Sequence, residues 1–139
     1  ATECYTLDKL SAEQIKEKIF EISDGLGADV VFEGSGAHQA VPQGLDWLRN
    51  RGVYLIPGQY SSQGKVEISP ERITFAALQL IGSSQYSLCD VAAYIEFLKN
   101  NPQIMPKIRA VASTYAVSDI NKAFYDLEHG KAIKALLAE

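Results

Sequence analysis

The stretch Ala28-Asp29-Val30-Val31-Phe32-Glu33-Gly34-Ser35-Gly36, or ADVVFEGSG, decides how the rest of the chain is interpreted. Its first half is a short apolar run of the kind that forms a buried strand. Its second half places small residues around one acid, a pattern typical of a turn. Whether that turn also binds a ligand depends on the residues that come after the other strands of the same sheet.

Composition limits the classes of protein to consider. The chain has 139 residues, of which 47% are hydrophobic, enough for one globular domain. A net charge of -4 without a Lys/Arg cluster argues against nucleic acid as a partner. Cys4 and Cys89 form no zinc-binding pattern with His38 or His129 and no secreted disulfide framework. Because no signal-like or membrane-length apolar segment is present either, we expect a cytoplasmic protein that does not contact membranes.

Helix-like and strand-like periods alternate along the chain. Expected helices begin at Ser11, Ala37, Pro70, Asp90 and Ser118, with Ser11, Asp90 and Ser118 as N-caps and Gly25, Arg49, Asn100 and Gly130 as ends. Expected strands cover residues 3–7, 30–32, 53–56, 78–81, 108–117 and 132–137, and Asn50-Arg51-Gly52 is expected to separate a helix from a strand. This order predicts an α/β fold with a parallel sheet covered on both faces.

In such a sheet, ligands bind where the strands end at their carboxyl termini. Three strand ends carry small residues, namely Gly34-Ser35-Gly36, Pro57-Gly58-Gln59 and Gly82-Ser83-Ser84-Gln85. Small residues let a bound molecule approach the backbone closely. Each stretch alone indicates a turn, but three at equivalent places favour a binding crevice.

Four motifs give the chain a family resemblance. They are GLGADVVFEGSG, RNRGVYLIPGQ, LQLIGSS and YAVSDINKAFYDLEHGKAIKALL. Together they resemble the carboxy-terminal half of medium-chain dehydrogenases/reductases, the zinc-type alcohol dehydrogenase superfamily, and GQYSSQG resembles the alcohol or polyol branch more than the quinone reductases. The resemblance implies that residues 1–104 belong to a dinucleotide-binding Rossmann domain. It implies that residues 105–139 form a strand-helix-strand segment returning to the catalytic domain.

The resemblance also implies contacts to the adenosine half of a nicotinamide cofactor. Gly34, Ser35 and Gly36 match the loop that lies against the adenosine. Lys134 falls where relatives often place a basic residue near the phosphates. From the residues alone, a solvated charge on an edge strand is the simpler interpretation of Lys134.

The nicotinamide half is expected at the other two strand ends. Pro57, Gly58 and Gln59 match the segment that flanks the nicotinamide, where backbone groups hold the carboxamide. Pro57 departs from the expected chemistry, because proline has no N–H and only its carbonyl can take part. Ser83 and Gln85 match a further carboxamide contact.

Glu33 has two interpretations. It could be a buried acid tuned for proton transfer, as perturbed carboxyl groups in clefts often are. The interpretation we favour is that it accepts hydrogen bonds from nearby backbone and fixes the loop after it.

Several parts of such an enzyme have no counterpart in these residues. The chain has no GxGxxG turn for a pyrophosphate, no later acid for a ribose, no zinc ligands and no catalytic residue that we can assign. In the usual sheet order 3-2-1-4-5-6, strands one and two are missing, and residues 3–7 would be the third. We therefore expect a fragment of a longer enzyme, with a partial Rossmann-like sheet whose central edge is unpaired.

The expected function is that of the parent enzyme, an oxidoreductase that uses NAD or NADP on a small alcohol, polyol or carbonyl substrate. The resemblance also allows zinc in the parent. The strand from Leu78 to Ile81 is expected to pair across a twofold axis and form a dimer. Two alternatives stay open, a stand-alone α/β binding or interaction module and, less favoured, a methyltransferase-like domain.

Overall fold

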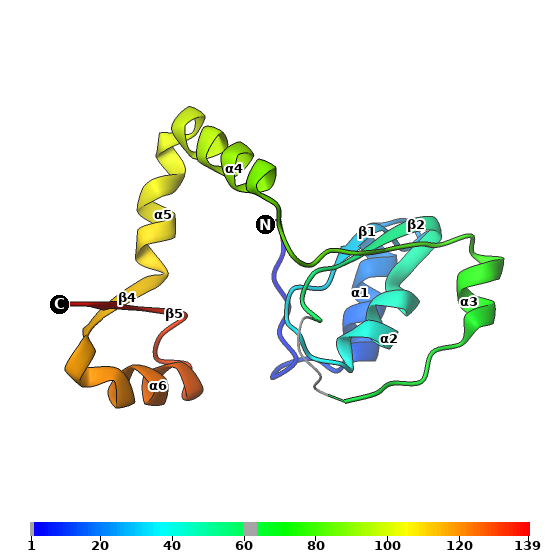
Figure 1. The fold of residues 1–139 in the computed structure, drawn as a ribbon. Coiled ribbons are helices and arrows are strands. Elements are labelled where there is room, and N and C mark those ends of the chain that lie inside the picture. Colours follow the sequence, from blue (N-terminus) through cyan, green and yellow to red (C-terminus); the bar gives the residue numbers. More distant parts are fainter. Residues whose placement is uncertain (1, 60–63) are drawn as a thin grey trace. The chain divides into compact units, whose positions relative to one another are not determined.

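The computed structural model describes residues 2–59 and 64–139, and it divides into two compact units, Ala1–Gln85 and Tyr86–Glu139 (Figure 1). Part of the GQYSSQG motif, residues 60–63, lies outside the described residues. The expected domain boundary after residue 104 concerns the parent enzyme and stays a prediction.

The first unit contains a parallel sheet. In chain order its elements are α1 (Ala12–Ile22), β1 (Ala28–Phe32), α2 (Ala40–Trp47), β2 (Leu48–Ile56), α3 (Pro70–Phe75) and β3 (Gln79–Gly82). The strands lie in the order β1-β2-β3, and both pairs are parallel. This arrangement confirms the α/β prediction, and it matches the last three strands of the order 3-2-1-4-5-6.

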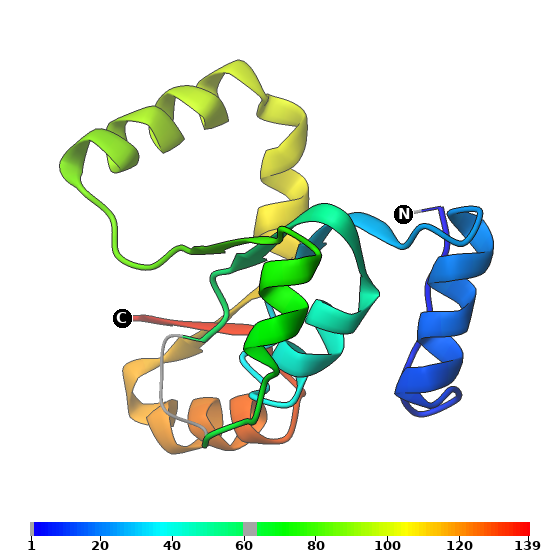
Figure 2. The same cartoon turned by 90° about the vertical axis from the view of Figure 1, so that its right-hand side faces the viewer.

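One face of this sheet is packed against α2 and α3, which Figure 2 shows from the side. Tyr54 is fully buried at the centre of the cluster, and its hydroxyl donates a hydrogen bond to the carbonyl of Ala40, 2.8 Å away. Its buried neighbours are Leu45, Leu48, Ala76 and Leu78. Because the Tyr54 hydroxyl has a partner, its burial costs little.

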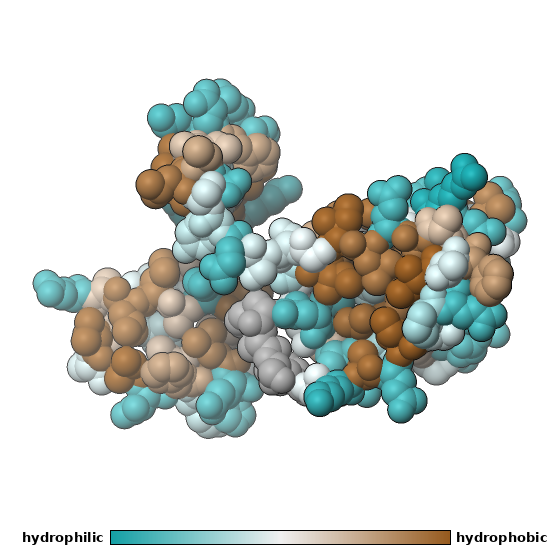
Figure 3. Space-filling model, turned by 45° about the vertical axis from the view of Figure 1, so that its right-hand side comes forward, coloured by the Kyte–Doolittle hydropathy of each residue, from teal (hydrophilic) through white to brown (hydrophobic). Residues whose placement is uncertain are grey.

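Side chains that point to the opposite face of the sheet are apolar but exposed, so the prediction of a sheet covered on both faces is wrong for the described residues. Val30, Phe32 and Ile81 have 55%, 68% and 45% of their surface exposed, and Phe32 pairs through Leu55 with Ile81 across the three strands. Figure 3 shows hydrophobic residues gathered on the visible side of this unit. Among the described residues, no strand pairs with the outer edge of β1 or of β3.

The second unit contains the expected strand-helix-strand segment. Its elements are α4 (Leu88–Asn100), η1 (Pro102–Ile104), α5 (Met105–Ala110), β4 (Ala112–Ala116), η2 (Val117–Asp119), α6 (Ile120–Glu128) and β5 (Lys134–Ala138). The strands β4 and β5 are parallel. The hydroxyl of Tyr115 donates to Asp126 at 3.0 Å, which attaches β4 to α6.

Two strand predictions in the first unit were wrong. Residues 3–7 form no strand, because extended backbone needs a partner strand for its N–H and C=O groups. Asn50-Arg51-Gly52 does not separate two elements but lies inside β2, where Arg51 has a φ of 60° and the pairing with β1 shifts register. The turn signal was therefore real, and it marks a bulge.

Helix starts were less well predicted than helix interiors. Ser11 is confirmed as an N-cap with Gln14 completing the capping box. Ser87, not Asp90, caps α4, and Asp90 is the partner residue three positions on. Residues 108–110 belong to α5 rather than to a strand, because proline stands in the first turn of that helix. Asp119, not Ser118, is the N-cap position of α6.

Gly44 provides a test of the packing around Tyr54. A Cβ at Gly44 would overlap the Tyr54 hydroxyl. We expect Gly44→Ala to lower the free energy of unfolding by roughly 1–3 kcal/mol, despite the better helix propensity of alanine. Urea unfolding measures this change. The control is Gly82→Ala, where a Cβ meets nothing within 4 Å, and equal effects of the two substitutions would contradict the assignment.

Candidate functional site

The site lies where β1 and β2 end side by side. The two strands are parallel, so their carboxyl ends meet at one edge of the sheet. The N–H of Glu33 donates to the carbonyl of Leu55 at 2.9 Å, and the N–H of Gly58 donates to the carbonyl of Glu33 at 3.0 Å. The backbone ladder therefore continues past both strands and joins the loops that extend from them.

The side chain of Glu33 forms the centre of this junction and is only 4% exposed. Its Oε1 accepts hydrogen bonds from the Ser35 N–H at 2.8 Å, the Ser35 hydroxyl at 2.7 Å and the Gly36 N–H at 2.9 Å. Its Oε2 accepts from Gln59 Nε2 at 3.0 Å. A buried carboxylate with this many donors is stable as the anion.

The charge of Glu33 is determined by those contacts. Burial acts to raise the pKa of Glu33, but the hydrogen bonds from Ser35, Gln59 and the backbone outweigh it, so the pKa lies below its ordinary value. The carboxylate is one of the two causes, after burial, that raise the pKa of Tyr54 to about 12. Glu33 is therefore ionised at neutral pH, and the prediction that it fixes the loop is confirmed by its contacts.

Gly36 and Gly58 allow the two loops to touch. A Cβ on Gly58 would lie 2.5 Å from Glu33 Oε2 and 2.8 Å from the Gly36 nitrogen. Gly36 has a φ of 74°, and a Cβ there would lie 3.0 Å from the Gly58 carbonyl oxygen. Both glycines are thus required by contacts inside the protein, in addition to any role toward a ligand.

The side chain of Gln59 is also used for hydrogen bonds inside the protein. Its Nε2 donates to Glu33 and also to the carbonyl of Ala37 at 3.1 Å. An amide nitrogen carries two hydrogens, so both are used. What Gln59 can offer to a ligand is its backbone and its side-chain oxygen. This role for the side chain was missed from the sequence, where only its place in the strand end was visible.

The structure also gives the positions of the other predicted site residues. Ser83 comes directly after β3, and its N–H lies 3.4 Å from the carbonyl of Ile56, at the same edge of the sheet. Gln85 is exposed and has a φ of 66°. Pro57 is half-buried beside Gly58. Lys134 belongs to the second unit, where it is the exposed first residue of β5.

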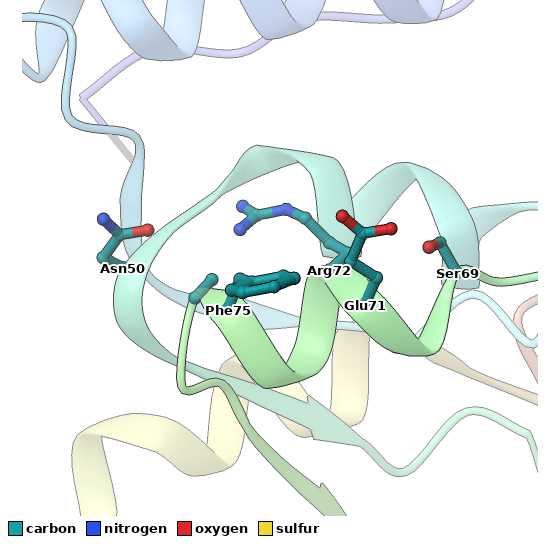
Figure 4. Close-up of a pocket in the computed structure, with 6 residues that line it drawn as sticks. Asn50, Ser69, Glu71, Arg72 and Phe75 are labelled. Atoms are coloured by element: carbon teal, nitrogen blue, oxygen red, sulfur yellow. The ribbon is translucent and has the colours of Figure 1, made fainter.

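A hollow of about 490 Å³ occurs elsewhere in the first unit (Figure 4). It is lined by Asn50, Ser69, Glu71, Arg72, Phe75 and Ala76. Asn50 lies near the beginning of β2, at the opposite end of that strand from Ile56. Arg72 donates to the carbonyl of Leu48 at 2.6 Å, so its guanidinium already has a structural partner. None of the residues predicted as site residues lines this hollow.

Neither a cluster of metal ligands nor a membrane-spanning helix occurs in the described part of the chain. In residues 2–59 and 64–139, no group of three or more His, Cys, Asp or Glu side chains could hold a metal ion. Over the same ranges, no helix has the length and apolar character needed to span a membrane.

Comparison with known sequences places the chain among dehydrogenases. Residues 3–100 match the family described as zinc-binding dehydrogenase. The chain is 35% identical to a sorbitol dehydrogenase of Halalkalibacterium halodurans over 133 residues, which are 96% of this chain and 38% of that protein. It is 28% identical to D-xylulose reductase A of Aspergillus oryzae over 99% of its length, again 38% of the relative. The chain thus spans well under half of the curated relatives it matches.

Solved structures show the same fold. The chain superposes on an alcohol dehydrogenase of Thermotoga maritima with a TM-score of 0.80 and 23% identity, over 94% of this chain and 35% of that one. An alcohol dehydrogenase zinc-binding domain protein of Burkholderia ambifaria gives 0.73 with 22% identity, over 99% of this chain and 36% of that one. The parallel sheet is therefore the arrangement found in these proteins.

The buried carboxylate makes stability depend on pH. Because the folded-state pKa of Glu33 is lowered, its ionised form stabilises the fold above the unfolded pKa. That stability is lost as the pH falls through the folded value. We expect Glu33→Gln to reduce the urea midpoint at pH 7, with the difference from wild type shrinking below about pH 4. Glu17→Gln, on the exposed face of α1, is the control, and a difference that grows on acidification would contradict the assignment.

Proposed function

The chain belongs to the zinc-binding dehydrogenase family, and from this premise we propose that it is one part of an NAD(P)-dependent oxidoreductase. The proposed reaction moves a hydride between an alcohol or polyol and a nicotinamide cofactor, NAD or NADP. Similarity to a sorbitol dehydrogenase and to a D-xylulose reductase supports the polyol class. The nicotinamide ring, when bound, accepts or donates the hydride.

The observation that carries the proposal is the junction of two strand ends around Glu33. This junction fixes the backbone of Gly34, Ser35 and Gly36 at the edge of a parallel sheet, where such folds bind dinucleotides. In the proposed complex these three residues lie against the adenosine half of the cofactor. The loop is held before any ligand arrives, so little ordering is required on binding.

The second loop is proposed to hold the nicotinamide half. The carbonyl of Pro57 and the backbone of Gly58 and Gln59 would orient the carboxamide. Ser83 and Gln85 are proposed as the further carboxamide contact, since the Ser83 N–H lies next to the end of β2. Lys134 is proposed to stand near the cofactor phosphates in the parent enzyme.

Zinc, which the family's description implies, does not fit the described residues, since they bring together no set of three or more suitable ligands. A stand-alone binding module is disfavoured, because the family match and the alignments to dehydrogenases run through most of the chain.

Location and assembly complete the proposal. Cys4 and Cys89 are free and exposed, as is usual in the reducing cytoplasm, where we expect the enzyme to act.

We also propose that the enzyme is a dimer that pairs through the strand predicted at Leu78 to Ile81. In the structure this strand is β3, which spans Gln79–Gly82 and so begins one residue later than predicted. Leu78, directly before it, is buried in the core.

A chimera tests the function. Residues 1–139 replace the matching segment of the Halalkalibacterium sorbitol dehydrogenase, and NAD(P)-dependent oxidation of polyols is measured. We expect kcat/KM within about tenfold of the parental enzyme, a loss of at most ~1.4 kcal/mol of transition-state stabilisation. A Gly58→Val chimera, in which the two loops cannot meet, is the negative control. A folded chimera that binds neither NAD nor NADP contradicts the proposal.

A substitution in the edge strand β3 tests the proposed dimer. A lysine on an edge strand discourages pairing with another strand, so Ile81→Lys should convert a dimer of the chain into a monomer in sedimentation velocity. The matched control is Ile133→Lys, because Ile133 is 77% exposed in the second unit. A monomeric wild-type chain at high concentration, or equal sedimentation of both variants, argues against pairing through β3.

A further inference from the structure

We propose that Glu33 is a positioning residue that couples the two loops of the cofactor crevice, the adenosine-side loop at residues 34–37 and the nicotinamide-side loop at residues 57–59. Each loop keeps the conformation that binds the cofactor only while the other loop keeps its own. The inference rests on the proposed function for the identity of the ligand. Its structural half, the coupling of the loops, stands on the contacts of Glu33 alone.

The two oxygens of the carboxylate serve different loops. Among the described residues, Oε1 accepts hydrogen bonds only from its own loop, from Ser35 and Gly36. Oε2 reaches the second loop through Gln59. Gln59 in turn donates to the carbonyl of Ala37, back in the first loop. The side chains of Glu33 and Gln59 therefore form a closed circuit of hydrogen bonds between the loops.

A second link between the loops does not depend on the side chain of Glu33. The Gly58 N–H donates to the Glu33 carbonyl at 3.0 Å, and this bond is made by the backbone. Replacing the side chain of Glu33 thus removes one link and leaves the other in place. The contribution of the carboxylate can be measured without removing every contact between the loops.

The chemistry of the circuit requires an acceptor at both positions of the Glu33 side chain. Every partner that the carboxylate has in residues 2–59 and 64–139 is a donor, namely two backbone N–H groups, one hydroxyl and one amide nitrogen. A glutamine at position 33 has the same shape, but its amide nitrogen faces a donor unless the Gln59 amide turns over, and that turn gives up the Gln59 bond to the Ala37 carbonyl. We therefore expect Glu33→Gln to weaken the circuit despite its nearly unchanged volume.

Exchanging the two side chains restores the polarity between the loops. In the double variant Glu33→Gln/Gln59→Glu, the amide nitrogen at position 33 donates to a carboxylate at position 59. The bond to the Ala37 carbonyl is lost, because a carboxylate cannot donate to it. The gain over the single variant is a charge-assisted hydrogen bond between the loops, and the carboxylate at position 59 also meets the Ala37 carbonyl oxygen, so recovery should be partial. A residue that only fills space offers no reason for such a rescue.

The experiment measures two quantities for wild type, Glu33→Gln, the double variant and the control Glu17→Gln. The first is amide hydrogen exchange at residues 34–37 and 58–59 in the 139-residue chain. The second is the Kd of NADH for the chimera with the Halalkalibacterium sorbitol dehydrogenase. We expect Glu33→Gln to speed exchange at both loops and to raise the NADH Kd by about tenfold. The double variant should reverse part of both changes.

Three results would overturn parts of this proposal separately. Faster exchange at residues 34–37 with unchanged exchange at residues 58–59 overturns the coupling. Faster exchange at both loops with an unchanged NADH Kd overturns the positioning role. Failure of the folded wild-type chimera to bind either NADH or NADPH, while exchange behaves as expected, overturns the proposed function and supports the coupling of the loops.

Discussion

The candidate site depends on one buried carboxylate. Glu33 stands at the end of β1, and its two oxygens bind donors from its own loop and from the loop after β2. Burial of a carboxylate is unfavourable unless donors compensate it, so these donors and the carboxylate hold one another in place. The close approach of Gly36 to Gly58 completes the junction, because neither position has room for a side chain.

Elements with strong local signals were predictable from the sequence. The apolar run at residues 30–32 indicated β1, and Ser11 with Gln14 indicated the start of α1. Elements whose form depends on distant partners were not. Residues 3–7 have strand composition without a strand, because no partner lies beside them in the described chain. The bulge at Arg51 is held by a bond from its N–H to the Ala76 carbonyl, a contact that no local pattern reveals.

The location of the candidate site was predictable from the sequence, but the contacts that hold its two loops together were not. Small residues after three strands indicated where parallel strands end, and the structure places two of these strand ends in direct contact. The sequence could not show that the Gln59 amide is used inside the protein, because that depends on a pairing across 26 positions of the chain. Lys134 was predictable as an exposed charge on the last strand, and the structure places it there, in the second compact unit.

The central claim is that Glu33 is an ionised, fully bonded carboxylate between the two loops. A site-resolved carbon-13 NMR titration of the Glu33 side-chain carboxyl in the 139-residue chain tests it most directly. We predict a pKa below the ordinary glutamate value of about 4.3, because donors from Ser35, Gln59 and Gly36 outweigh the effect of burial. A pKa at or above that value would show that the carboxylate lacks these donors and would contradict the claim.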